Sequence, residues 1–176
     1  MRVWLGLRVV AVGEESATGE QLTTPFSDWV VVYEANAERL IKLATFMVGP
    51  ADAADVVSEA IARAVRSPQW QSVDNHAGYL SRVVVNEASR MLDRAHRRSS
   101  RELRAARRVD VDAVEPPVDV LAAVRLLSAR QRAVVFLAYW EDLTPAMIAV
   151  RLGVSQGSVH RHLARAKTKL RRVLHD

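Results

Sequence analysis

The segment Pro145–Ala164 reads PAMIAVRLGVSQGSVHRHLA and decides the fold of the C-terminal part. Thr144 and Pro145 can start a helix, because a threonine side chain caps free N–H groups and a proline at the first position loses no hydrogen bond. Gly153 can end that helix in the left-handed conformation, and Ser155 can cap the next one. Two helices joined by so short a turn predict a helix-turn-helix.

Small and apolar residues of this segment stand where two packed helices need them. Ala149 allows the helices to approach closely, Val159 packs back against the first helix, and Ile148 and Leu152 point inward. Residues 151–176 hold seven Lys and Arg against one acid, an excess that phosphate contacts would use. An ordinary helical hairpin with a solvated face explains the small residues equally well but the charge less well. We therefore predict DNA binding.

Side chains of the final helix divide by position. Those near its N-terminus can reach base edges in the major groove, and Arg161 and Arg165 are the strongest candidates for base contacts. Lysines further along suit phosphate, which adds affinity without sequence information. The predicted duplex-DNA residues are Gln156, Ser158, His160, Arg161, Arg165, Lys167 and Lys169.

The rest of the chain divides into modules by composition. Residues 1–25 begin with a short apolar run and then turn polar, which predicts a flexible extension. Helical spacing runs through 26–108, acids and two prolines mark 109–117 as a linker, and four helices fill 118–176. We predict an all-α fold of two small helical domains joined by an acidic, proline-containing linker, the second a four-helix domain with the helix-turn-helix.

Composition limits the classes of function. The chain of 176 residues carries a net charge of +5 and has a pI near 10.2, which favours nucleic acid as partner. It has no Cys, its five His show no metal-ligand spacing, and it has no phosphate-cradling glycine loop. We expect no catalytic residue, no metal and no cofactor. We also expect a cytoplasmic protein without membrane insertion, because the apolar start is too short to span a bilayer.

The helix that begins at Asp52 and the loop after it carry unusual chemistry. Asp55 and Glu59 lie on a different face from the apolar stripe, either as a solvated surface or as an acidic contact. The loop 68–77 combines Trp70 with polar side chains, and the tryptophan suits either the core or an unpaired base.

Two stretches together resemble a known family. Residues 52–66, DAADVVSEAIARAVR, and 127–174, LSARQRAVVFLAYWEDLTPAMIAVRLGVSQGSVHRHLARAKTKLRRVL, are similar to the extracytoplasmic-function sigma factors of RNA polymerase. The resemblance covers about 26–174 and implies a first domain that melts promoters and binds polymerase. It implies an alternative sigma factor that directs promoter-specific initiation, with core RNA polymerase and promoter DNA as partners. An anti-sigma factor is left open as a third partner.

The resemblance also implies roles for individual residues. In this family the second helix of the first domain docks on core polymerase, and the loop and helix that follow capture an unpaired base of the melted promoter strand. Aromatic rings can stack on such a base, while amide and guanidinium groups hydrogen-bond to it and its backbone. The implied polymerase contacts are Asp55, Val56 and Glu59, and the implied melted-strand residues are Trp70, Asn75, His76, Tyr79, Arg82 and Asn86.

Some positions depart from the family pattern. Ser58 and Ile61 replace the usual Gln and Phe, Met147 replaces a Glu that would complete a capping box, and His160 replaces a Lys or Arg of the recognition helix. The base preference therefore cannot be transferred from the family. A stand-alone helix-turn-helix repressor or activator is the alternative function, in which the first module would dimerise or sense a ligand.

Overall fold

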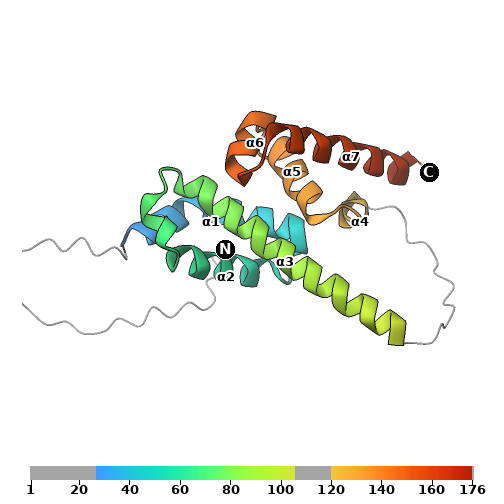
Figure 1. Ribbon diagram of the computed structural model, residues 1–176, viewed down its shortest axis with the longest axis horizontal. Helices are drawn as coiled ribbons and strands as arrows, with labels where there is room; N and C mark the ends of the chain where they lie inside the picture. Colours follow the sequence, from blue (N-terminus) through green and yellow to red (C-terminus); the bar gives the residue numbers. More distant parts are fainter. Residues whose placement is uncertain (1–26, 106–119, 176) are drawn as a thin grey trace, which may run out of the picture.

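A computed structural model describes residues 27–105 and 120–175 (Figure 1). These ranges contain helices and no strand, which confirms the predicted all-α fold. The predicted extension 1–25 and linker 109–117 lie outside the described residues. The helices are α1 (Ser27–Val48), α2 (Ala53–Val65), the 3₁₀ helix η1 (Pro68–Ser72), α3 (His76–Ala105), α4 (Val120–Arg125), α5 (Ala129–Tyr139), α6 (Pro145–Leu152) and α7 (Gln156–His175).

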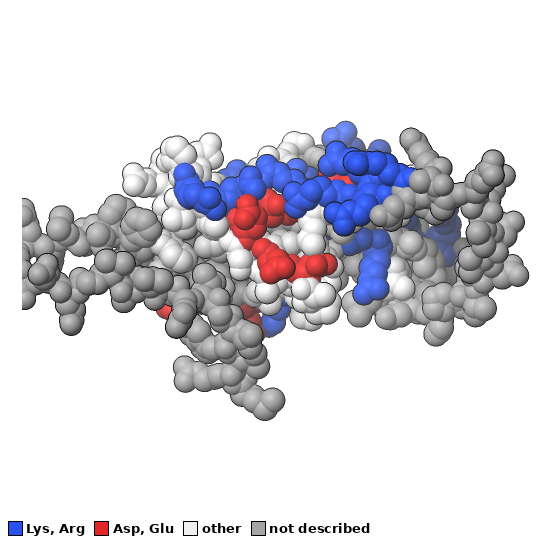
Figure 2. All heavy atoms as spheres, turned by 90° about the horizontal axis from the view of Figure 1, so that it is seen from below, with Lys and Arg blue, Asp and Glu red and all other residues white. Residues whose placement is uncertain are grey.

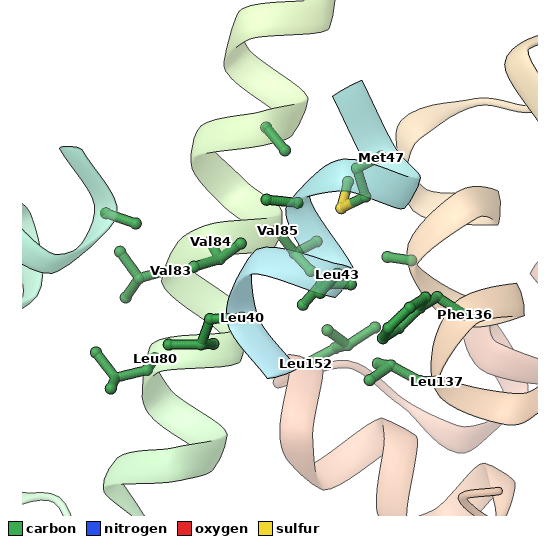
Figure 3. Packing of buried hydrophobic residues seen from close by; sticks show 14 of the residues in the cluster. Leu40, Leu43, Met47, Leu80, Val83, Val84, Val85, Phe136, Leu137 and Leu152 are labelled. Atoms are coloured by element: carbon green, nitrogen blue, oxygen red, sulfur yellow. The ribbon is translucent and has the colours of Figure 1, made fainter. Parts of the chain in front are cut away.

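Helices α1, α2 and α3 pack against one another through their apolar sides. Leu40, Leu43 and Met47 of α1 are fully buried, and so is Val84 of α3 (Figure 3). These residues recur three or four positions apart, which places them on one side of each helix. The packing leaves the polar sides of α2 and α3 on the surface.

The stretch between α2 and α3 was expected to be a loop but contains η1. The Ser67 hydroxyl accepts a hydrogen bond from the backbone N–H of Gln69 at 3.3 Å, and Pro68 occupies the first position. A capped proline start favours a short helix even where no periodic pattern exists. This turn carries Trp70 into the core, where the residue is 6% exposed.

Helices α5, α6 and α7 begin directly after residues that were predicted to cap them. Ser128 and Gln131 form the reciprocal capping box of α5. Thr144 accepts from the N–H of Met147 at 3.3 Å and starts α6, and Gly153 ends it with φ of +65°. Ser155 then accepts from a backbone N–H of α7 at 3.2 Å. The turn that sets the angle between α6 and α7 is therefore specified locally.

The two halves of the chain share one buried core. Phe136 and Leu137 of α5 and Leu152 of α6 lie beside Leu43 of α1 (Figure 3). The rings of Phe46 and Phe136 are 5.4 Å apart between centroids. Hydrophobic periodicity did not reveal this contact, because it shows which side of a helix is buried but not what covers that side.

Candidate nucleic-acid interface

Helix α7 has a core face and a free face. Val159 and Ala166 are fully buried. Gln156, His160, Arg161 and Arg165 are exposed, while Ser158 is partly buried. Gln156 and His160 are one turn apart, and so are Arg161 and Arg165, but the two pairs lie on adjacent sides of the helix. The four residues therefore form one broad exposed surface at the end nearest the turn, with the position and chemistry of a base-reading surface.

The two predicted lysines of α7 already have contacts within the protein. The ammonium group of Lys167 lies 5.8 Å from the centroid of the exposed Tyr139 ring. Nζ of Lys169 donates to the backbone carbonyl of Leu126 at 2.6 Å, at the end of α4. Lys169 thus ties α7 to α4, and its predicted phosphate contact stays a prediction.

His162 stands on α7 among cations. Burial lowers the pKa of its imidazole below the ordinary value, and Arg130, Arg165 and Arg161 lower it further. Both causes disfavour the charged ring. The positive potential of this surface therefore comes from Arg and Lys, and His162 adds little to it at neutral pH.

Four of the six predicted melted-strand residues form a continuous set of contacts. The His76 ring lies edge-on to Trp70 at 4.5 Å between centroids, and its Nε2 is 3.0 Å from the Trp70 carbonyl oxygen. The Tyr79 ring is 6.1 Å from that of Trp70, and the Arg82 guanidinium lies 5.5 Å from the Tyr79 centroid. Trp70 and Tyr79 are 6% and 7% exposed, so both are packing residues in this conformation.

The other two predicted melted-strand residues lie beside this set. Asn75 is exposed and caps α3, since its Oδ1 accepts from the N–H of Gly78 at 2.8 Å. Asn86 is partly buried, one helical turn beyond Arg82. The first turns of α3 thus place an amide, an imidazole and a guanidinium near two buried aromatic rings. Base capture by these residues stays a prediction.

The acidic side of α2 is only partly as expected. Asp55 and Glu59 are exposed, and Glu59 pairs with Arg63 at 3.0 Å. Val56 is 3% exposed and belongs to the core, because it follows the apolar stripe of α2. Of the three predicted polymerase contacts, only the two carboxylates reach the surface.

A buried carboxylate organises the basic side of α3. Glu87 is 3% exposed, and its oxygens lie 3.4 Å from Arg63, 3.2 Å from Arg90 and 3.4 Å from Arg94. Charge-assisted contacts of this kind fix the direction of long side chains. On the face shown in Figure 2, basic side chains form a row with acidic side chains beside it. Single-stranded nucleic acid needs such a basic track for its backbone.

Comparison with known proteins shows the family of this chain. Sigma-70 region 2 matches residues 32–99, and Sigma-70 region 4 matches residues 118–170. The RNA polymerase sigma-E factor of Streptomyces antibioticus is 30% identical over 136 residues, which are 71% of this chain and 72% of that protein. The chain belongs to the extracytoplasmic-function sigma factors. It is an alternative sigma factor that directs transcription initiation, as predicted.

Further relatives of this sigma factor cover more of the chain. The ECF RNA polymerase sigma factor SigE of Mycolicibacterium smegmatis is 30% identical over 172 residues, which are 90% of this chain and 65% of that protein. The sigma factor RpoE of Bartonella quintana, solved in complex with the anti-sigma factor NepR, has a TM-score of 0.59 at 20% identity. The match covers 84% of this chain and 96% of RpoE, which shows a common fold.

Sequence reasoning missed Glu87, although a signal for it exists. Glu87 stands three positions after Val84 and seven after Leu80, on the apolar side of α3. A carboxylate at a core position has to be paired, and arginines follow it on the same helix.

Within 27–105 and 120–175, no helix of this sigma factor is long and apolar enough to cross a membrane.

Proposed function

We propose that this sigma factor divides promoter recognition between its two halves. Helix α7 reads a duplex promoter element, the start of α3 holds the melted strand, and α2 docks on core RNA polymerase. The observation that carries the proposal is the exposed surface at the start of α7, which Gln156, His160, Arg161 and Arg165 form. The protein needs no catalytic residue of its own, since the polymerase supplies the chemistry.

The proposed hold on the melted strand rests on the contacts at the start of α3. Arg82 supplies a cation, Asn75 and His76 supply polar groups, and the row of arginines around Glu87 continues along the same helix. Trp70 and Tyr79 would act by supporting these groups, because both are nearly buried. In a strand-bound state, either ring would have to become exposed before it could stack on a base.

The family assignment favours this division over a stand-alone repressor or activator, because both sigma regions match in this chain. RpoE has been solved with an anti-sigma factor, and we propose that this chain also has a partner of that class. Polymerase and promoters lie in the cytoplasm of bacteria, so the proposal places the protein there.

Two pairs of acids test the docking surface. Asp55 and Glu59 of α2 are exposed one turn apart, and Glu34 and Glu38 of α1 are a matched exposed pair at the same spacing. The double variant Asp55→Ala/Glu59→Ala should lose binding to core polymerase in size exclusion. It should keep its affinity for duplex DNA, because α7 is untouched.

The control variant Glu34→Ala/Glu38→Ala should bind polymerase as the wild-type protein does. Full polymerase affinity in the α2 variant would overturn the docking assignment. Equal losses in both variants would mean that net charge, and not this surface, determines binding.

A further inference from the structure

Glu141 links the two halves of the chain through a partly buried ion pair. Its carboxylate is 9% exposed and lies 3.2 Å from Nη1 of Arg39, a residue of α1 that is 26% exposed. The same carboxylate oxygen, Oε2, also accepts a hydrogen bond from Arg151 of α6, which is 21% exposed. One carboxylate thus stands between two arginines, one from each half.

Removing this carboxylate would leave the two arginines facing each other. Burial lowers the pKa of Arg151, the nearby Arg39 lowers it further, and Glu141 opposes both effects. Arginine stays charged in proteins, so the repulsion cannot be relieved by loss of a proton. A partly buried charge without its partner is strongly unfavourable, and separation of the two halves would return both arginines to water.

Neighbouring polar contacts reinforce the same junction. Nη2 of Arg39 donates to the backbone carbonyl of Ala77 at the start of α3, at 3.1 Å. Arg132 of α5 donates to the backbone carbonyl of Met47 at the end of α1. The junction therefore combines charged contacts at its rim with the shared apolar core.

This junction brings the helix-turn-helix against the start of α3. The turn residue Gly153 approaches Arg82 so closely that a Cβ on Gly153 would lie 2.8 Å from Nη1 of Arg82. Arg82 is the one arginine among the six predicted melted-strand residues. Arg161 and Arg165 at the start of α7 remain exposed in this arrangement, so the contact does not cover them.

We propose that the free protein is held in a closed form by Glu141 between Arg39 and Arg151, and that this form blocks Arg82 while leaving α7 free. The closed chain can bind duplex DNA but not the melted strand. Opening of the junction exposes the start of α3. The assignment of Arg82 rests on the proposed function, whereas the closed form itself does not.

Distance measurements on the full chain test the closed form without DNA or polymerase. The protein has no cysteine, so Gln71→Cys and Ala164→Cys introduce two labelling sites at exposed positions, one in each half. Spin labels at these sites should show one narrow distance distribution in the otherwise wild-type protein. Glu141→Gln should broaden the distribution and shift it to longer distances.

A second variant opens the junction from the other side. Arg39→Ala leaves the pair of Glu141 and Arg151 intact, so it keeps the local contacts of the helix-turn-helix. It should lengthen the distance as Glu141→Gln does. Glu38→Gln is the matched control, because Glu38 forms an exposed pair with Lys42 on the same helix. An unchanged distribution in both junction variants, or a broad one in the wild-type background, would overturn the closed form.

Binding of single-stranded DNA tests the blocking of Arg82. The probe is a fluorescein-labelled single strand of mixed sequence, and both junction variants should bind it about fivefold more tightly or better, as expected when a competent state becomes populated. Duplex affinity should change by less than about twofold, because the contact surface of α7 is free in both forms. Longer distances with unchanged single-strand affinity would show that the junction opens but does not block the strand.

Discussion

The backbone of Gly153 and the guanidinium of Arg82 are in close contact across the two halves of the protein. A Cβ added to Gly153 would lie only 2.8 Å from Nη1 of Arg82. Gly153 also has φ of +65°, a conformation that costs other residues about 1–2 kcal/mol. Gly153→Ala should therefore lower the free energy of unfolding by at least about 1 kcal/mol in urea denaturation.

Gly157 is the matched control for Gly153. It stands in α7, and a Cβ added to it would have no neighbour within 4 Å. Gly157→Ala should therefore be neutral or stabilise the protein by up to about 1 kcal/mol, because alanine favours a helix more than glycine does. Equal effects of the two substitutions would contradict the role assigned to the turn.

Arg161 is predicted to read a base. Arg161→Ala should weaken binding to the preferred duplex by about 1–3 kcal/mol and flatten the difference between that duplex and single-base variants. Arg171 is exposed further along the same helix, and Arg171→Ala should weaken all duplexes alike and reduce the salt dependence by about one phosphate contact. Competition binding over a series of salt concentrations separates the two effects, and uniform losses for both would rule out the assigned roles.

Glu87 is predicted to stabilise the arginine row of α3. Glu87→Gln removes the charge that holds three arginines and should lower the free energy of unfolding by about 1.5–3 kcal/mol, the range for hydrogen bonds to charged groups. Glu59→Gln removes only an exposed pair with Arg63 and should cost about 0.5 kcal/mol or less. Thermal denaturation of both variants measures the difference, and similar small effects would mean that Glu87 is not an organising residue.

The lowered pKa of His162 predicts how stability depends on pH. The folded protein disfavours the charged imidazole, while the unfolded chain takes up a proton near the ordinary value of about 6.5. Above that pH, His162 should not reduce the free energy of unfolding. As the pH drops through that value, the free energy of unfolding should fall, and below the lowered pKa of the folded state it should fall no further on account of His162. His162→Gln should remove this part of the pH dependence in urea denaturation. An unchanged profile would mean that another group causes the dependence.

Local signals in the sequence predicted where helices begin and end, but they did not predict contacts between residues that are far apart in the chain. Ser128, Thr144 and Gly153 act through neighbouring backbone groups, so their roles could be read from spacing alone. Trp70 was ambiguous, because a tryptophan in a polar stretch suits both a core and a base. Glu141 could not be assigned from the sequence, since its partner Arg39 stands 102 positions away.

Among the predicted site residues, too, local periodicity was a better guide than position within a family motif. Helical periodicity predicted an exposed surface at the start of α7, and Gln156, His160, Arg161 and Arg165 are exposed there, whereas Ser158 is partly buried. Val56 was carried over from the family together with Asp55 and Glu59, but periodicity places Val56 on the apolar side of α2. The position of Val56 in the family motif therefore predicted a polymerase contact, but its burial in the core keeps its side chain from the surface.

The most direct test of the central claim uses purified full-length protein and core RNA polymerase that lacks any sigma subunit. We predict a stable complex in size exclusion and transcription of genomic DNA from discrete start sites, which would also reveal the promoter sequence. Clean binding to duplex DNA without a polymerase complex, or transcription without defined starts, would contradict the assignment of this chain as a sigma factor.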